Sequence, residues 1–340
     1  MSLGEFDLID QFFKRPAGRS PHRAVVGNGD DCAVVAPAPG MQLAISTDTL
    51  VEGRHFLSTV APDRLGHKAL AVNLSDLAAC GARPLGFTLA LTIPRVDSAW
   101  LAEFSRGLLA LADAYDCELI GGDTTAGPLS ITITALGEVP AGQALLRSGA
   151  RPGEDCWVSG QPGEARLALE AFRGSLHPPL DGPTFEAVRT RLECPMPRVT
   201  LALALRGIAT SAIDISDGLL GDLGHVLRAS RVGALIAPDE LPMNPHLRGR
   251  SREEALDMVL AGGDDYELLF TAPLERRADI DHIGVQLGLI LTRIGTLASE
   301  PGLRLMRGRL DALEKSCGGL EGATPVLMDN RWTSFDHFRS

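Results

Sequence analysis

The amino-acid sequence predicts a layered α/β protein with two domains, an α/β domain at residues 1–140 and an α+β domain at residues 141–340. A length of 340 residues suits two domains. Apolar strand-like runs alternate with amphipathic helical segments in both halves, which favours mixed α/β or α+β layers. The halves are separated by a dense group of turn-forming residues, namely Pro140, Gly142, Gly149, Pro152 and Gly153. Such a density of helix and strand breakers is typical of a domain boundary.

Side-chain periodicity predicts the elements of the first half. Residues 41–46, 87–93 and 131–139 are predicted strands, because they are apolar or alternate between apolar and polar side chains. Residues 97–115 give the clearest helix, since apolar side chains recur at steps of three and four along one face. A second helix is predicted at residues 64–80, where leucines and alanines form a similar stripe.

The second half repeats this alternation with shorter elements. Short apolar runs predict strands at residues 156–159, 212–215 and 266–271. Amphipathic spacing predicts helices at residues 163–172, 219–229 and 252–260. The helix at 219–229 is entered through an acidic turn, so that polar groups stand between a strand and a helix.

Composition and charge exclude several classes of function. The formal net charge is −11 and the isoelectric point is about 5.2, which disfavours a nucleic-acid or anionic-membrane binder. Neither a secretory signal nor a long apolar span is recognisable, so a soluble, cytoplasmic protein is expected. The six cysteines are scattered without a Cys-x-x-Cys pair, as expected for reduced thiols rather than disulfides or a zinc site.

Six short acidic clusters carry the chemical signal. Each places aspartate beside Gly, Ser or Thr near the end of an apolar run, at residues 29–31, 46–49, 73–76, 121–124, 214–218 and 262–267. A single cluster is more often a turn or a helix cap. The six clusters together favour a ligand site, because most of them lie at predicted strand ends, where α/β proteins bind ligands. Carboxylates and hydroxyls are the ligands that Mg²⁺ prefers, and neighbouring glycines let backbone approach a polyphosphate.

The sequence contains neither a P-loop nor the glycine loop and catalytic loop of a protein kinase. The negative charge of a bound nucleotide is therefore expected to be neutralised by metal ions and by an arginine. Arg147 is the candidate arginine, although a lone arginine is more often a solvated surface residue. His55 and Trp332 suit an organic substrate, because an aromatic face can stack on a heterocycle. On composition alone, a tryptophan such as Trp332 is more often a packing residue.

In their order along the chain these clusters resemble the thiamine-monophosphate kinase family of the aminoimidazole ribonucleotide synthetase superfamily, from about residue 4 to residue 338. The string Asp-Thr-Leu-Val-Glu-Gly-Arg-His-Phe at residues 48–56 is its most specific part. The resemblance implies an N-terminal domain that forms a homodimer and a C-terminal α+β domain beside it. It implies transfer of the γ-phosphoryl group of ATP to thiamine phosphate, the last step of thiamine diphosphate biosynthesis.

The resemblance also implies a role for each matching residue. Several Mg²⁺ ions are expected on Asp30, Ser46, Thr47, Asp48, Asp76, Asp123, Asp214 and Asp217, of which Asp48, Asp123 and Asp217 are expected to be catalytic. ATP is expected to contact Tyr115, Gly121, Gly122, Arg147 and Ser216. Thiamine phosphate is expected to contact His55, Glu267 and Trp332. The family commonly has Glu where this chain has Asp264, and Asp264 is therefore left out of the site.

The acceptor of the implied reaction is a phosphate oxygen that is already anionic, so no strong general base is expected. Several Mg²⁺ ions would screen the repulsion between the phosphates, and direct in-line transfer needs no phosphoenzyme. Three related enzymes are alternatives. Selenophosphate synthetase is disfavoured because no reactive cysteine lies in an early Lys- and Gly-rich loop, and the hydrogenase-maturation dehydratase because its C-terminal cysteine is missing. Aminoimidazole ribonucleotide synthetase shares the nucleotide and metal chemistry but lacks the string around His55. A non-catalytic sensor of a nucleotide or of thiamine diphosphate is a further alternative, which binds without forming ADP.

Overall fold

The computed structural model describes residues 5–14, 24–27, 31–306, 308, 310 and 327–328. The chain forms two compact units. The N-terminal unit comprises Met1–Ala144 and Glu193–Val199, and the C-terminal unit comprises Leu145–Leu192 and Thr200–Ser340. The expected ranges 1–140 and 141–340 contain no such return of residues 193–199 to the first unit.

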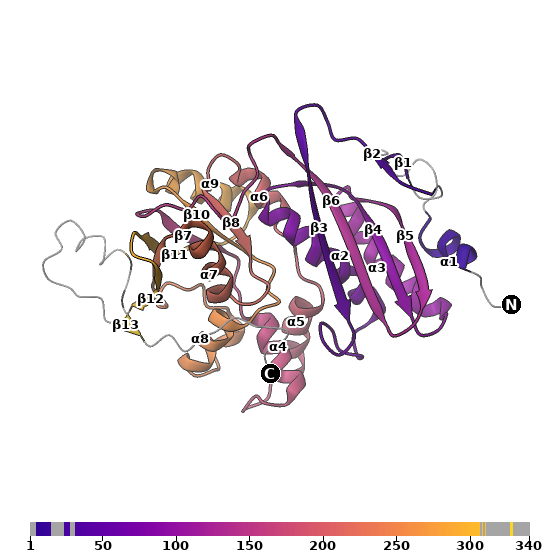
Figure 1. Cartoon of the computed structure of the whole chain (residues 1–340). Helices are drawn as coiled ribbons and strands as arrows, with labels where there is room; N and C mark the ends of the chain where they lie inside the picture. The colour runs from indigo at the N-terminus through magenta and orange to yellow at the C-terminus, as the bar shows by residue number, and fades with distance from the viewer. Residues whose placement is uncertain are drawn as a thin grey trace, which may run out of the picture. The chain divides into compact units, whose positions relative to one another are not determined.

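The N-terminal unit is built on a four-stranded sheet with two long helices on one face (Figure 1). The strands lie in the order β3 (Met41–Val51), β6 (Ser130–Pro140), β4 (Arg83–Ile93) and β5 (Glu118–Ala126). β6 pairs antiparallel with β3 and β4, whereas β4 and β5 are parallel. The covering helices are α2 (Pro62–Ala79) and α3 (Ser98–Ala114). The unit also contains α1 (Glu5–Phe12) and the β1–β2 pair (Ala24–Val26 with Val34–Val35).

Close helix packing explains how α2 and α3 share one face of this sheet. A β-carbon on Gly66 of α2 would lie 2.1 Å from the carbonyl oxygen of Phe104, and one on Gly107 of α3 would lie 1.8 Å from that of Asp63. Only glycine allows the two backbones to approach this closely. α3 begins where Asp97 Oδ1 accepts two backbone N–H groups, as an N-cap residue does.

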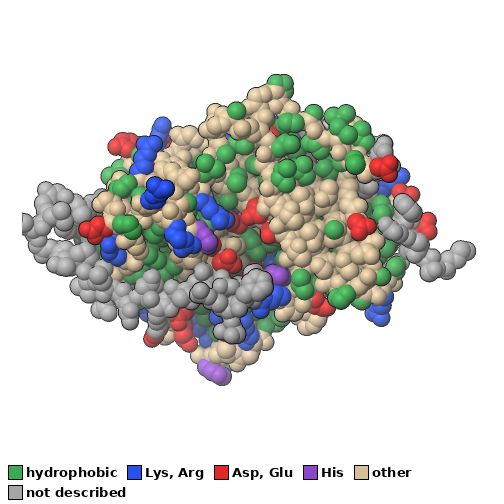
Figure 2. Space-filling view, viewed as in Figure 1, with side chains coloured by type: hydrophobic (Ala, Val, Ile, Leu, Met, Phe, Trp, Pro, Cys, Tyr) green, Lys and Arg blue, Asp and Glu red, His purple; other side chains and the backbone are tan. Residues whose placement is uncertain are grey.

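No helix among the described residues covers the other face of the sheet, which we call the open face. Its residues include Ile45, Thr47 and Thr49 of β3, which pair with Leu136, Thr134 and Thr132 of β6. The threonine hydroxyls are bonded across the strands at 2.9 Å, and the Ile45 side chain is 63% exposed. In Figure 1 the strands lie in front of α2 and α3, and the matching view in Figure 2 shows few charged side chains over this sheet.

The C-terminal unit is built on a seven-stranded sheet. Its strands lie in the order β13 (Leu327–Met328), β12 (Gly302–Met306), β9 (Gly233–Ile236), β11 (Leu291–Ala298), β7 (Asp155–Ser159), β10 (Leu268–Ala272) and β8 (Ser211–Asp214). β12 is parallel to β9, whereas β7, β8, β10 and β11 pair antiparallel.

Six helices accompany this sheet in the described part of the unit. They are α4 (Glu164–Arg173), α5 (Gly182–Glu193), α6 (Val199–Leu205), α7 (Leu219–Ser230), α8 (Arg252–Ala261) and α9 (Arg277–Leu287), with 3₁₀ turns at Pro245–Leu247 and Leu274–Arg276. α5 ends and α6 begins at the residues where the chain passes between the two units. Apolar side chains from α4, α7, α8 and the central strands form one buried core.

Each predicted helix and strand is found, one strand begins later than predicted, and further elements were not predicted. The strand predicted at residues 266–271 begins only at Leu268, because Tyr266 has a φ of +50°, outside the β region. Strand β5 was not predicted. Among the described residues, no helix is long and apolar enough to cross a membrane, and the cysteines there are free thiols.

Candidate active site

A polar cluster lies between the edge strand β3 and helix α2. Ser46 Oγ donates a hydrogen bond to Asp76 Oδ2, so the Ser46 side chain faces α2, and Asp48 shares that face by strand alternation. The backbone N–H of Asp48 donates to Asn73 Oδ1 at 3.1 Å. The buried Asn73 amide is itself fixed, because Nδ2 donates to the Ala69 carbonyl at 3.0 Å. The cluster therefore presents a hydroxyl and two carboxylates on a rigid frame.

His55 lies in the turn after β3 and has a defined orientation. The N–H of Val51 donates to His55 Nδ1 at 3.0 Å, so the neutral ring carries its proton on Nε2 and can donate from there. The carbonyl oxygen of His55 accepts a hydrogen bond from Lys68 Nζ at 3.3 Å. Lys68 is only 3% exposed on α2, which ties the His55 turn to the same helix as Asn73 and Asp76.

Two predicted ligands, Thr47 and Asp123, belong to the opposite face of the sheet. Thr47 Oγ1 is bonded to a threonine of β6 on the open face. Asp123 pairs with Ala90, an exposed residue between the buried Leu89 and Leu91, so the register assigns Asp123 to the open face too. The structure thus brings Ser46, Asp48 and Asp76 together, but not Thr47 and Asp123 with them.

Gly121 and Gly122 adjoin Asp123 on β5 and differ in their surroundings. A β-carbon on Gly122 would lie 1.9 Å from the Leu89 carbonyl oxygen, so only glycine fits this position. Nothing lies within 4 Å of the corresponding point at Gly121, which leaves space beside its backbone. Tyr115 ends α3, and its hydroxyl donates to the Pro197 carbonyl at 2.9 Å, within the returning segment of this unit.

Two acidic loops are joined through their backbones in the C-terminal unit. Asp214 ends β8, the loop after it holds Ser216 and Asp217, and the loop before β10 runs from residue 262 to 267. The N–H of Asp264 donates to the Ser216 carbonyl at 2.8 Å, and that of Tyr266 donates to the Ile215 carbonyl at 2.9 Å. Asp264 and Tyr266 both have positive φ values, a strained conformation that these bonds hold in place.

Asp222, in the first turn of α7, supports the first of these loops. Its Oδ2 accepts the N–H groups of Ser216 and Asp217, each at 3.1 Å, and the carboxylate is buried. Burial raises the pKa of Asp222 to about 7, although the backbone donors favour its ionised form. Asp222 was not predicted as a site residue.

Glu267, a predicted substrate contact, is fully buried within an ionic network. Its Oε1 accepts from Arg191 Nη2 at 3.0 Å and its Oε2 accepts from Ser159 Oγ at 2.6 Å. Arg191 Nε also lies 3.4 Å from Glu164 Oε2, and Glu164 Oε1 lies 2.6 Å from His246 Nδ1. The network fixes the orientation of the Glu267 carboxylate.

Asp265, beside this network, is a buried acid with one free oxygen. Its Oδ1 accepts the N–H of Gly163 at the start of α4, at 2.8 Å, while Oδ2 has no hydrogen-bond partner among the described residues. Burial raises the pKa of Asp265 well above its ordinary value. Such burial favours the protonated form of the carboxyl over the ionised form.

Arg147 is exposed, and its electrostatic contacts are with α7. The pKa of His225 on α7 is lowered first by desolvation and then by Arg228 and Arg147, while Asp217 opposes the shift. Both Arg147 and Asp217 therefore act on the same imidazole. The predicted ligand Asp30 and the predicted substrate contact Trp332 lie outside the described residues.

Comparisons with known proteins decide between the related families. Residues 29–139 match the family model for AIR synthase related protein, N-terminal domain. The chain is 45% identical over 341 residues to the thiamine-monophosphate kinase of Salmonella typhimurium, and the match covers 99% of each chain. The chain belongs to the thiamine-monophosphate kinase family.

Solved structures agree with this membership. The crystal structure of thiamine-monophosphate kinase from Stenotrophomonas maltophilia K279a is 45% identical, with a TM-score of 0.82 over 90% of this chain and 97% of that one. The structure of AaThiL complexed with AMPPCP and TMP is 28% identical, with a TM-score of 0.71 over 90% of this chain and 95% of that one. The expected α/β fold of the thiamine-monophosphate kinase family is confirmed.

The oxygen donors of this thiamine-monophosphate kinase family member suit Mg²⁺. Within the described ranges, no three Asp, Glu, His or Cys side chains gather as a metal site made of protein ligands alone. Mg²⁺ commonly takes one or two carboxylates and completes its shell with water and phosphate oxygens. The Ser46–Asp76 pair beside Asp48, and Asp217 beside Ser216, are partial sites of that kind.

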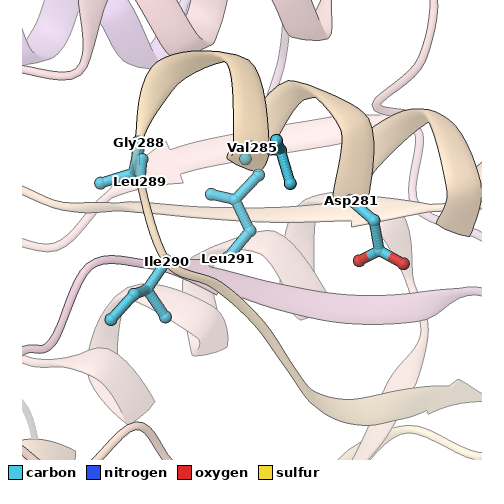
Figure 3. A pocket seen from close by; sticks show the side chains of 7 residues that line it. Asp281, Val285, Gly288, Leu289, Ile290 and Leu291 are labelled. Atoms are coloured by element: carbon cyan, nitrogen blue, oxygen red, sulfur yellow. The ribbon is translucent and has the colours of Figure 1, made fainter.

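A shallow hollow in the C-terminal unit has the wrong chemistry for this family's site. It lies where α9 passes into β11, and Figure 3 shows Val285, Ile290 and Leu291 around it with Asp281 at one side. The lining is mainly apolar and offers one carboxylate, with no cationic side chain to hold a phosphate. None of the predicted site residues lines it.

We expect Arg191→Met to lower the free energy of unfolding by about 3 kcal/mol, because it leaves the buried Glu267 carboxylate without its counter-ion. Urea unfolding followed by tryptophan fluorescence measures this change. Arg173→Met is the matched control, since Arg173 pairs with Glu170 at the surface and such a pair contributes about 0–1 kcal/mol. Equal losses in the two variants would contradict the structural role given to Arg191.

Proposed function

We propose that this protein transfers the γ-phosphoryl group of ATP to thiamine monophosphate, giving thiamine diphosphate and ADP. The observation that carries the proposal is the ordered cluster of Ser46, Asp48, Asp76 and Asn73, in a chain that matches a thiamine-monophosphate kinase over its full length. The relative AaThiL was solved with AMPPCP and TMP, which supports a nucleotide and a thiamine phosphate as the two substrates.

Mg²⁺ is the proposed metal. When bound, it screens the repulsion between the donor and acceptor phosphates and stabilises charge on the transferring group. The proposed ligands are Asp30, Ser46, Thr47, Asp48, Asp76, Asp123, Asp214 and Asp217. Asp48 is suited to this role because Asn73 bonds to its backbone N–H, so that the strand segment carrying the carboxylate is fixed before substrate binds.

The chain's own part in the reaction is to bind and orient the two phosphates. The proposed nucleotide contacts are Tyr115, Gly121, Gly122, Arg147 and Ser216, and the proposed thiamine phosphate contacts are His55, Glu267 and Trp332. The attacking phosphate oxygen is anionic at neutral pH, so no residue has to remove a proton from it. Direct in-line transfer then requires positioning more than proton transfer.

Assembly and location are part of the same proposal. The N-terminal unit binds ATP and Mg²⁺ and dimerises through the open face, and the C-terminal unit supplies Ser216, Asp217 and Glu267. The open face supports dimerisation because Ile45, Leu43 and Val51 are large apolar side chains exposed there or beside it. Synthesis of thiamine diphosphate from ATP suits a cytoplasmic enzyme.

The test of the proposed function is ADP release by the purified chain with ATP and Mg²⁺. The acceptors compared are thiamine monophosphate, free thiamine and none, with thiamine diphosphate measured as the product. Release only with thiamine monophosphate is the expected result. Binding of Mg·ATP without ADP release from any acceptor would overturn the proposal in favour of a sensor.

Removal of the His55 imidazole is expected to raise the KM for thiamine monophosphate by about 10- to 100-fold, the effect of losing one hydrogen bond to a charged group. The reason is that the Val51 N–H bonds to Nδ1, which fixes the orientation of the ring and places the proton of the neutral imidazole on Nε2. Steady-state kinetics of His55→Ala measure the change, with the KM for ATP unaltered. His282→Ala, an exposed histidine of α9, is the control. An unchanged KM in His55→Ala would remove His55 from the site.

A further inference from the structure

Three consecutive backbone N–H groups converge on one buried carboxylate in the C-terminal unit. Asp222 is 3% exposed, and its Oδ2 lies 3.1 Å from the nitrogen of Ser216 and 3.1 Å from that of Asp217. The N–H of Gly218 is bonded to the same carboxylate. A charged acceptor binds backbone donors more strongly than a neutral one, so this side chain fixes the course of the loop.

The same loop is held from its other side by the strained loop before β10. The Ser216 carbonyl accepts the N–H of Asp264 at 2.8 Å, and the N–H of Ile215 donates to the Glu267 carbonyl at 2.8 Å. The backbone of Ser216 is therefore bonded at both its N–H and its carbonyl. Bonds at both groups fix the backbone of Ser216 and therefore the direction in which its side chain leaves the loop.

We propose that Asp222 is a positioning residue for phosphoryl transfer, which acts by holding the backbone of Ser216 and Asp217 so that their side chains meet the nucleotide phosphates and the metal. The inference rests on the proposed function, which gives Ser216 and Asp217 those contacts. Asp222 itself is buried beneath the loop and accepts only from its backbone in the bonds described. Its effect on the reaction is therefore transmitted through these two residues.

A purely structural carboxylate would support folding without affecting phosphoryl transfer. A matched residue in the N-terminal unit serves as the control that distinguishes this structural role from the positioning role. Asp97 Oδ1 also accepts two backbone N–H groups at the start of a helix, each at 3.1 Å, from Ala99 and Trp100. Asp97→Asn and Asp222→Asn make the same substitution in the same kind of side-chain-to-backbone bond. Only Asp222→Asn alters a bond to a loop that contains proposed nucleotide and metal contacts, namely Ser216 and Asp217.

The experiment compares these two variants with the unchanged protein. Asp222→Asn is expected to lower kcat for thiamine diphosphate formation by about 10- to 100-fold, the effect of losing groups that orient metal ligands. Calorimetry is expected to show Mg·AMPPCP binding weakened by about tenfold by the same loss. The KM for thiamine monophosphate stays within about twofold, because that substrate's proposed contacts lie elsewhere. Asp97→Asn is expected to alter neither kcat nor Mg·AMPPCP binding.

A double-mutant cycle tests whether the effect passes through Asp217. In an Asp217→Asn background, Asp222→Asn is expected to cause little further loss of kcat, because residues acting as a unit are not additive. Full additivity would overturn the proposal, as would a kcat and an Mg·AMPPCP affinity within twofold of the unchanged protein. Should Asp222→Asn not fold, Asp222→Glu keeps the charge and displaces it by one methylene, with the same loss of kcat expected.

Failure of the proposed function is distinguishable from failure of this inference. If the unchanged protein forms no thiamine diphosphate, the proposed reaction is wrong. The calorimetric comparison of Mg·AMPPCP binding then still tests Asp222 by itself, since it needs no turnover. Weaker binding in Asp222→Asn alone supports the positioning role, and equal binding in all three proteins overturns it.

Discussion

Asp48→Asn is expected to lower kcat by about 10³-fold, equivalent to about 4 kcal/mol of transition-state stabilisation. The amide has the size of the carboxylate but no charge, and it turns N–H donors toward a site built to receive cations. The backbone of Asp48 is held by Asn73, and the neighbouring pair Ser46–Asp76 completes a group of hard oxygen donors. Steady-state ADP formation with thiamine monophosphate across a range of Mg²⁺ concentrations measures the loss.

The control for this prediction is Glu103→Gln, which removes an exposed carboxylate from α3 in the same unit. We expect its kcat to stay within about twofold, because a surface ion pair contributes little. The thermal midpoint of Asp48→Asn should match that of the unchanged protein, since the backbone bond to Asn73 does not involve the carboxylate. A kcat within tenfold of the unchanged protein would remove Asp48 from the catalytic group.

The sequence predicted elements whose side-chain period is long and regular. The helix expected at residues 97–115 is α3 (Ser98–Ala114), because its apolar stripe and its Asp97 cap are both local signals. Strand β5 gave no such signal, since it contains Gly121, Gly122 and Asp123, which have low strand propensity. It exists because β4 pairs with it and because Gly122 permits close approach to Leu89. Both causes are tertiary contacts.

The same distinction applies to the candidate site. Motif order identified the acidic loops and the cluster that contains Asn73, but the supporting residues Asp222 and Arg191 were not singled out. Arg191 is 76 residues from Glu267 along the chain, and spacing alone gives no reason to pair them. Strand alternation could have separated Thr47 from Ser46 and Asp48, because successive side chains point to opposite faces. Only the register between β4 and β5 assigns Asp123 to the open face.

Ile45→Asp is expected to convert the proposed dimer into a monomer. Ile45 is 63% exposed on the open face and pairs with Leu136 across β3 and β6. A two-fold dimer would bury this position twice, so each dimer would contain two uncompensated charges in an apolar contact. Several kcal/mol per buried charge would raise the dissociation constant by about 10³-fold or more. Light scattering coupled to size-exclusion chromatography, at micromolar concentration, measures the mass.

An exposed apolar side chain is not by itself evidence of an interface. The control for Ile45→Asp is therefore Val285→Asp, which changes another exposed apolar side chain. Val285 is 82% exposed beside the hollow between α9 and β11, where an aspartate meets solvent and should leave the mass unchanged. A monomeric unchanged protein would refute the dimer itself. A dimeric protein that stays dimeric in Ile45→Asp would instead show that the open face is not where the copies meet. Loss of the dimer in Ile45→Asp but not in Val285→Asp would assign the contact to the sheet face that also carries Thr47 and Asp123.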